Sequence, residues 1–196
     1  MKRKQKTYTI AFRRKRKGKT DYKKRLKLLL VKKPRIAVRK SLKNILIQII
    51  EYDSKGDKIL VSTHTNELKK LGWKANKTNL PAGYLCGYLL GKKAKEKNIS
   101  ECIFDIGMYP SIKGSLFYSV LKGLIDAGMN IPHSIEIFPK KERIQGKHIA
   151  DWAKRLKNEA DDKFKKTFSA YIKEGLDPEK IDIHFNEIKK KIEGTK

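Results

Sequence analysis

The uneven distribution of acidic residues along this basic chain most restricts how it can fold. Residues 1–33, 34–139 and 140–196 each contain 16 lysines and arginines, but they contain one, nine and eleven acidic residues respectively. The single acid of the first segment is Asp21. A segment with so little neutralisation and so few apolar residues cannot bury enough surface to fold alone. We therefore expect a basic N-terminal arm over 1–33 that a partner orders.

The net charge of the whole chain indicates the kind of partner. The formal charge is +27 at pH 7 and the isoelectric point is near 10.0. Such a charge would repel itself in a compact particle unless a polyanion neutralised it, and nucleic acid is the obvious polyanion. The 39% of apolar residues allows a folded core. A membrane would require an apolar anchor, but we find neither a signal-peptide core nor a run of about 18 apolar residues.

Residues that bind metals or carry redox chemistry are few and scattered. Cys86 and Cys102 lie in apolar surroundings, which is typical of reduced thiols and not of a disulfide framework or a zinc site. The four histidines lack metal-ligand spacing, and no nucleophile motif is recognisable. We therefore expect a cytoplasmic protein with no enzyme activity, no metal and no cofactor.

The arm has the composition of an RNA-binding segment. Residues 13–19 (RRKRKGK) form a run of cations that could be a solvated face or a localisation signal. However, Tyr8, Phe12 and Tyr22 are interleaved with the cations, and such rings can stack on bases while the cations neutralise phosphates. A helix is predicted from Asp21 to about Val31, with Thr20 as its N-cap and an apolar stripe of Leu26, Leu29 and Leu30.

The segment 34–139 has the pattern of a mixed α/β domain. Three apolar runs predict strands at 35–39, 45–50 and 58–62, and the turn residues 53–57 favour antiparallel pairing of the last two. A helix follows, capped by Thr78 or Asn79 with Pro81 in its first turn; then come a strand over 101–106 and a helix between Gly114 and Gly128. The predicted fold class is α/β, with a mixed, mainly antiparallel sheet in the order β-β-β-α-β-α.

The last segment, 140–196, predicts an α-helical C-terminal extension. One apolar pattern runs from Ile149 through Trp152 to Phe164, and a second begins at Asp177 and continues to Ile192.

Two apparent catalytic signals favour structural roles. Gly83, Gly87 and Gly91 precede Lys92 and superficially resemble a phosphate-binding loop, but that loop has four residues between its glycines. We interpret these glycines as one helix face that lets a sheet or an RNA backbone approach closely.

A nuclease of the ribonuclease H type would need clustered acids for metal ions. Asp105 is the only acid inside a predicted strand core, and Arg35 and Arg39 stand where an acidic ligand would be wanted. We expect Asp105 to shape the strand end before Gly107.

Four stretches together carry a resemblance to a known family: 12–22 (FRRKRKGKTDY), 34–41 (PRIAVRKS), 123–133 (GLIDAGMNIPH) and 143–149 (RIQGKHI). They resemble large-subunit ribosomal protein eighteen of the archaeal type, which is related to the longer eukaryotic large-subunit protein five. The similarity extends from about Phe12 to Trp152.

The resemblance implies a structural constituent of the large ribosomal subunit that binds 5S rRNA and attaches it at the central protuberance. Its other implied partners are large-subunit rRNA and neighbouring ribosomal proteins of the central protuberance. The chain departs from the family at Leu116, where a basic residue is expected, so an RNA contact there is doubtful. The implied RNA-binding residues are Arg13, Arg14, Arg16, Lys17, Lys19, Tyr22, Arg35, Arg39, Lys40, Ser41 and Asn44.

An alternative hypothesis is a general basic RNA-binding or scaffold protein that docks protein neighbours through its helical tail. The near balance of charge over 140–196 is compatible with that role.

Overall fold

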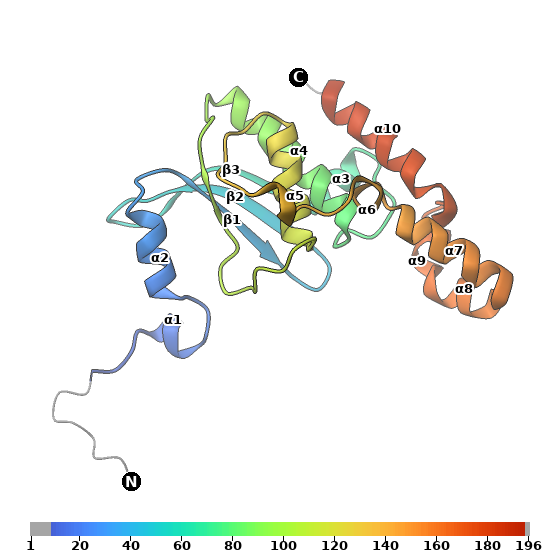
Figure 1. Cartoon of the computed structure of the whole chain (residues 1–196), viewed down its shortest axis with the longest axis horizontal. Helices are drawn as coiled ribbons and strands as arrows, with labels where there is room; N and C mark the ends of the chain where they lie inside the picture. Colours follow the sequence, from blue (N-terminus) through green and yellow to red (C-terminus); the bar gives the residue numbers. More distant parts are fainter. Residues whose placement is uncertain (1–8, 195–196) are drawn as a thin grey trace, which may run out of the picture.

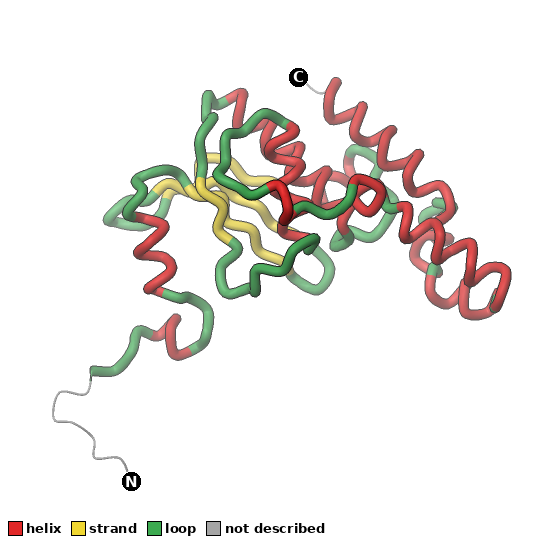
Figure 2. Tube along the Cα trace, viewed as in Figure 1, coloured by secondary structure: helices red, strands yellow, loops and turns green. Residues whose placement is uncertain are grey.

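The computed structural model describes residues 9–194 and contains a four-stranded sheet in the order β3-β2-β1-β4 (Figures 1 and 2). β1 pairs with β2, and β2 with β3, in antiparallel register, whereas β4 lies parallel to β1. The predicted α/β class and its mainly antiparallel sheet are confirmed. The strands are β1 (Arg35–Lys40), β2 (Ile45–Glu51), β3 (Lys58–His64) and β4 (Ile103–Asp105).

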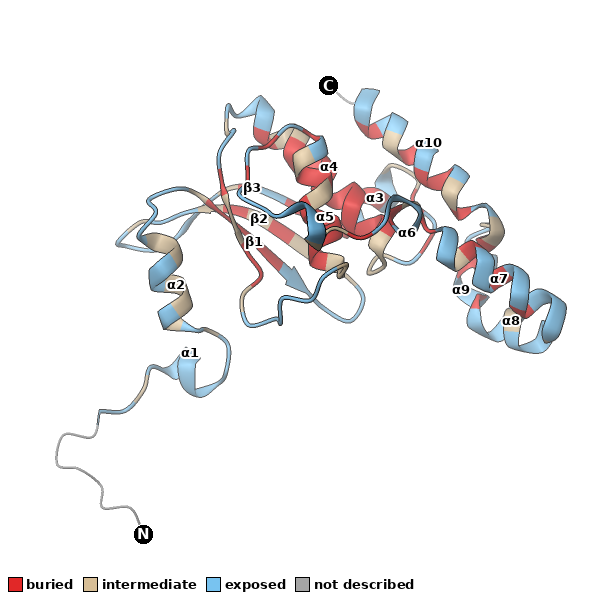
Figure 3. Ribbon diagram, viewed as in Figure 1, coloured by how far each residue is buried: buried red, intermediate tan, exposed pale blue. Residues whose placement is uncertain are grey.

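The two faces of the sheet differ because the strands alternate apolar and polar residues. Ile36 and Val38 of β1 lie on the same face as Ile47 and Ile49 of β2, and all four are buried. Helix α4 (Leu80–Glu96) packs against β2 and β3 on this face, and α5 (Leu116–Asp126) packs against α4 (Figure 3). The core of the molecule lies here.

Glycines bring α4 and α5 into close contact. A Cβ added to Gly87 would lie 2.3 Å from the carbonyl oxygen of Val120, and one added to Gly123 would lie 2.2 Å from that of Tyr84. The predicted packing role of the α4 glycines is confirmed, but their neighbour is a helix and not a sheet or RNA. The spacing in the sequence identifies a flat helix face without identifying what covers it.

Side-chain caps fix the helix starts around the sheet. Asn79, one of the two predicted caps, caps α4: its side chain accepts a hydrogen bond from the Ala82 backbone amide at 2.9 Å. A short helix that we did not predict, α3 (Thr65–Lys70), follows β3. His64 caps it through Nδ1, and Glu67 accepts from the His64 amide at 2.9 Å, so this histidine has a structural role.

The arm contains two short helices, α1 (Arg13–Arg16) and α2 (Tyr22–Leu29). Asp21, and not Thr20, caps α2, because its carboxylate accepts from the amides of Lys23 and Lys24. The predicted end at Val31 is also wrong: α2 stops at Leu29.

The C-terminal region is helical and folds back onto α4. Phe185 lies 5.5 Å from Tyr84 between ring centroids, and His184 stacks on Trp73 at 5.1 Å. The predicted continuous pattern through Phe164 is broken at Ala160, whose φ of −160° is not helical. The short η1 (Ile135–Ile137) precedes this region, whose elements are α6 (Lys141–Gln145), α7 (Lys147–Glu159), α8 (Asp161–Thr167), α9 (Ser169–Lys173), η2 (Pro178–Lys180) and α10 (Ile181–Gly194).

Candidate RNA-binding surface

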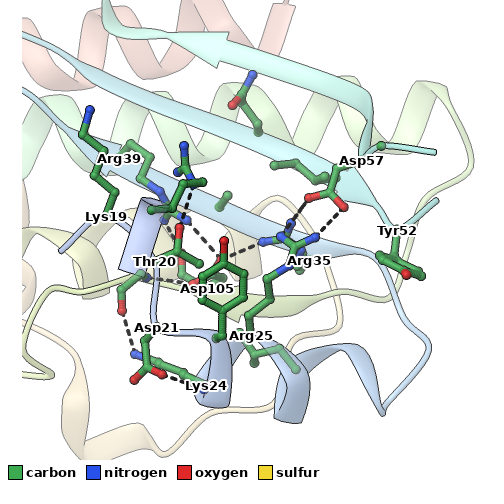
Figure 4. Close-up of a pocket in the computed structure, with 18 of the residues that line it drawn as sticks. Lys19, Thr20, Asp21, Lys24, Arg25, Arg35, Arg39, Tyr52, Asp57 and Asp105 are labelled. Carbon is green, nitrogen blue, oxygen red and sulfur yellow. Dashed lines mark hydrogen bonds and ion pairs between the residues drawn. The ribbon is translucent and has the colours of Figure 1, made fainter. Parts of the chain in front are cut away.

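The sheet face opposite α4, which we call the open face, carries the side chains of Arg35, Ala37, Arg39, Gln48 and Ile50. Helix α2 stands beside it, and a groove of about 540 Å³ lies between the two (Figure 4). We call this space the arm groove. The cations that line it come from the arm, from β1 and from the turn between β2 and β3: Arg14, Lys19, Lys24, Arg25, Arg35, Arg39 and Lys55.

Charges of alternating sign connect the elements around the arm groove. Arg25 of α2 binds Asp57 in the β2–β3 turn, and Asp57 also binds Arg35 of β1. Arg35 binds Asp105 of β4 at 3.0 Å, and Asp105 binds Arg39 at 3.1 Å (Figure 4). Five ionised side chains from four segments thus form one chain of ion pairs, which we call the charge chain.

The charge chain keeps its carboxylates ionised. The hydrogen bond from Arg25 holds the pKa of Asp57 below its usual value. Burial alone would raise the pKa of Asp105, but the charge of Arg39, the amide of Gly107 and the charge of Arg35 together keep it low. Both carboxylates are therefore anions at neutral pH.

Asp105 shapes the end of β4, as predicted. Its Oδ1 accepts a hydrogen bond from the Gly107 amide at 2.7 Å, and its Oδ2 contacts two guanidinium groups. Within residues 9–194, no group of three or more His, Cys, Asp or Glu side chains could hold a metal ion.

The predicted cations of the arm are exposed. Arg13, Arg16 and Lys17 project from α1 or its end and line no described part of the arm groove. Arg14 and Lys19 do line it, and Arg14 donates from Nε to the Thr20 hydroxyl at 2.8 Å.

The structure describes two of the three aromatic residues that were predicted to stack on bases. Tyr22 lines the arm groove, and its ring centroid lies 5.1 Å from that of Phe12, which is 69% exposed. Tyr8 lies outside the described residues.

The predicted residues of β1 differ in accessibility. Arg35 is only 6% exposed and both terminal nitrogens of its guanidinium bind carboxylates, so a direct phosphate contact would require those ion pairs to break. Its Nε has no hydrogen-bond partner in the described part of the chain. The side chain of Arg39 is 43% exposed and remains accessible from the arm groove.

Lys40, Ser41 and Asn44 lie in or beside the β1–β2 turn and do not line the arm groove. Ser41 and Asn44 close this turn, because the Ser41 hydroxyl accepts from the Asn44 amide at 3.0 Å. The Lys40 carbonyl accepts from the Tyr109 hydroxyl at 2.7 Å, which joins the turn to the loop after β4. These residues form a second polar surface.

Several residues of the arm groove were missed from the sequence. Gln48 had a recognisable signal, because it is the polar residue between the buried positions Ile47 and Ile49. Arg25 and Asp57 had none, since their partners are distant in the sequence. An RNA contact at Leu116 was doubtful from the sequence. In the structure this side chain packs closely against Gly83 of α4, because a Cβ added to Gly83 would lie 2.7 Å from Cδ1 of Leu116.

Comparison with known families identifies a relationship for the first half of the chain. None of the helices within the described residues is both long and apolar enough to cross a bilayer. Residues 6–100 match the family model described as "Ribosomal large subunit proteins 60S L5, and 50S L18". The matched region includes the arm, β1 to β3 and α4, and therefore most of the residues that line the arm groove.

Proposed function

Because the chain belongs to the family of large-subunit ribosomal proteins 60S L5 and 50S L18, we propose that it binds 5S rRNA and attaches that RNA to the large subunit at the central protuberance. As a member of this family the protein is a structural component of the ribosome and not an enzyme. Its place is the large ribosomal subunit, where it functions in translation as part of a ribonucleoprotein.

The observation that carries the proposal is the convergence of two sources of positive charge on the arm groove. The arm supplies Arg14 and Lys19, while the open face supplies Arg39. Cations at fixed positions on two sides of a groove can neutralise phosphates while the shape of the groove selects among RNA folds. The arm and the open face together would therefore recognise a folded RNA better than either alone.

In the proposed mechanism the exposed cations of 1–33 capture RNA first, and the folded domain then recognises its shape. Arg13, Arg16 and Lys17 would contact phosphates outside the arm groove, and Tyr22 offers a stacking surface within it. Arg35 acts indirectly, because it is buried and supports the groove through the charge chain.

The second polar surface, formed by Lys40, Ser41 and Asn44, lies elsewhere on the domain. We assign to it a contact with another part of the 5S rRNA or with large-subunit rRNA. The assigned units are the arm over 1–33, the 5S rRNA-binding domain over 34–139 and the extension over 140–196.

A scaffolding role for the extension is favoured by one observation. Trp152, Ile172 and Ile183 are 48%, 47% and 54% exposed on its surface. Large apolar side chains that remain on a surface are candidate contacts for a protein partner. Because α10 packs onto α4, substitution of these three residues by serine tests the role better than truncation after Pro139. Loss of assembly with retained RNA affinity is the expected result.

The test of the main proposal is competition between 5S rRNA and transfer RNA for the purified protein at near-physiological salt, because basic proteins bind any RNA at low salt. We expect 5S rRNA to bind at least about 1,000-fold more tightly, which is the lower end of the range that separates specific from non-specific nucleic-acid binding. Equal competition would contradict the proposal and reduce the protein to a general basic RNA binder.

A further inference from the structure

Helix α2 stands beside the open face although it contributes no buried residue (Figure 3). Leu26 within it is 61% exposed, and Leu30 directly after it is 70% exposed. Burial of an apolar face normally holds a short helix in place, and an isolated helix of eight residues is only marginally stable in water. Leu28 and Leu29 are only partly buried, and Leu28 lines the arm groove, so apolar contact with α2 is incomplete. Other interactions therefore contribute to fixing α2 against the sheet.

Polar contacts from two consecutive residues connect α2 to the sheet. Arg25 binds Asp57 with both terminal nitrogens, Nη1 to Oδ2 at 2.9 Å and Nη2 to Oδ1 at 2.8 Å. Lys24 donates from Nζ to the Gly107 carbonyl at 3.0 Å. A bidentate guanidinium–carboxylate pair fixes orientation as well as distance. Together these contacts attach the helix to the β2–β3 turn and to the end of β4.

Asp57 occupies the central position in this attachment. The same carboxylate that binds Arg25 also binds Arg35, which is buried and anchored in turn by Asp105 (Figure 4). The side chains of Arg25 and Asp57 are 29% and 24% exposed, so their pair is partly shielded from solvent. Without the anion at this position, two guanidinium groups would face each other across it and repel.

We propose that Asp57 is a positioning residue for RNA binding: by contacting Arg25 and Arg35 together, it docks α2 beside the open face and forms the arm groove before RNA arrives. This inference rests on the proposed function, since it concerns the same groove. An RNA that meets a docked helix does not bear the entropic cost of ordering it. The apparent dissociation constant accordingly rises in inverse proportion to the fraction of molecules in which α2 is docked.

Docking is measured first in the free protein, by hydrogen exchange of the backbone amides of residues 25–30. The variants are Arg25→Gln and the matched control Lys27→Gln, which removes the same charge from an exposed position of the same helix. We expect exchange to accelerate about tenfold in Arg25→Gln, because an undocked helix of this length unfolds readily. Lys27→Gln should exchange like the wild type.

Asp57→Asn keeps the size of the side chain and removes its charge. It should accelerate exchange over the same amides at least as much as Arg25→Gln does. If loss of a partner for the buried Arg35 unfolds this variant, Arg25→Gln still tests the inference, because it leaves Asp57 and Arg35 paired.

The same variants are then titrated with 5S rRNA at near-physiological salt. Arg25→Gln should weaken binding about tenfold if only about a tenth of its molecules keep α2 docked. Lys27→Gln should lower the affinity by no more than about threefold, through the loss of one charge. The inference requires both differences, in exchange and in affinity, and the absence of either overturns it. A wild-type protein that does not prefer 5S rRNA would instead contradict the proposed function and leave the exchange result unaffected.

Discussion

The two faces of the sheet are built from the same three long strands but serve different purposes. On the covered face, isoleucines and valines pack under α4, and glycines let α5 approach α4 at backbone contact distance. On the open face, arginines and aspartates pair in the charge chain beside a groove. Close packing of apolar side chains and backbone stabilises the covered face, and such packing tolerates little change in volume. Ion pairs stabilise the open face.

This difference has a consequence for function. A face whose cations are already paired with carboxylates keeps its shape when no RNA is present, and it still has a net positive charge because three guanidinium groups share two carboxylates. The excess of positive charge that no acidic residue neutralises is concentrated in the arm, where α1 has no buried residue. Stability and RNA affinity should therefore respond to substitutions in different parts of the molecule.

The largest effect on stability is expected from Gly87→Ala on the covered face. The new Cβ would lie 2.3 Å from the Val120 carbonyl oxygen, a backbone atom that cannot rotate away. We expect the free energy of unfolding to fall by about 3 kcal/mol, measured by urea denaturation. Gly194→Ala is the control, because a Cβ there meets no atom of residues 9–194 within 4 Å and should change stability by less than about 0.5 kcal/mol. Equal stability of both variants would show that α4 and α5 pack less closely than described.

The arm should give the opposite result. Replacing Arg13, Arg14 and Arg16 by alanine should lower 5S rRNA affinity about 100-fold, and the slope of log affinity against log salt should fall by about two to three. The free energy of unfolding should stay within about 0.5 kcal/mol of the wild type, since α1 buries nothing.

The control for the arm variant removes the same charge from exposed positions of α8 and α9, in Lys163, Lys166 and Lys173→Ala. It should lose less than about fivefold in affinity, because distant exposed charges are screened at this salt. A cooperative loss of structure in the arm variant, or equal losses of affinity in both, would contradict the separation of roles.

The smallest effect is a dependence of stability on pH that originates in the charge chain. The pKa of Asp57 in the folded protein lies below its ordinary value of 3.8, so its contribution to stability is present above that value and is lost as pH falls through the lower folded pKa. The free energy of unfolding of the wild type should exceed that of Asp57→Asn by about 2 kcal/mol between pH 5 and 7. The difference should shrink steadily as pH falls below 3.8.

The control for the pH experiment is Glu136→Gln. Glu136 pairs with Lys113 where both side chains are largely exposed, so its replacement should change stability little at any pH. A difference between wild type and Asp57→Asn that persists unchanged at pH 2 would mean that Asp57 stabilises the fold without its charge.

The sequence predicted most of the elements because their signals are local. Alternation of isoleucines marked β2, and Asn79 with Pro81 marked the start of α4. The start of α2 was displaced by one residue, since Thr20 and Asp21 can both cap a helix and only the structure shows which side chain accepts. The break at Ala160 was missed because the apolar pattern continues across it.

The part of the candidate site that depends on amino-acid composition was predictable from the sequence. The part that depends on ion pairs between distant residues was not. The cationic run of the arm is visible at once, but Arg35 had the same appearance as an exposed arginine. Its partners Asp57 and Asp105 are 22 and 70 positions away, so its burial follows from the topology of the sheet. The same separation hid Arg25, whose partner Asp57 is 32 positions away.

Chemical modification of lysines, in the free protein and in its complex with 5S rRNA at near-physiological salt, tests whether the RNA occupies the arm and the arm groove. We expect Lys17, Lys19 and Lys55 to lose at least about tenfold in reactivity when RNA phosphates bind there. Lys163, Lys166 and Lys173, on α8 and α9, should react equally in both states. Unchanged reactivity of the first three lysines in a saturated complex would show that the RNA binds elsewhere.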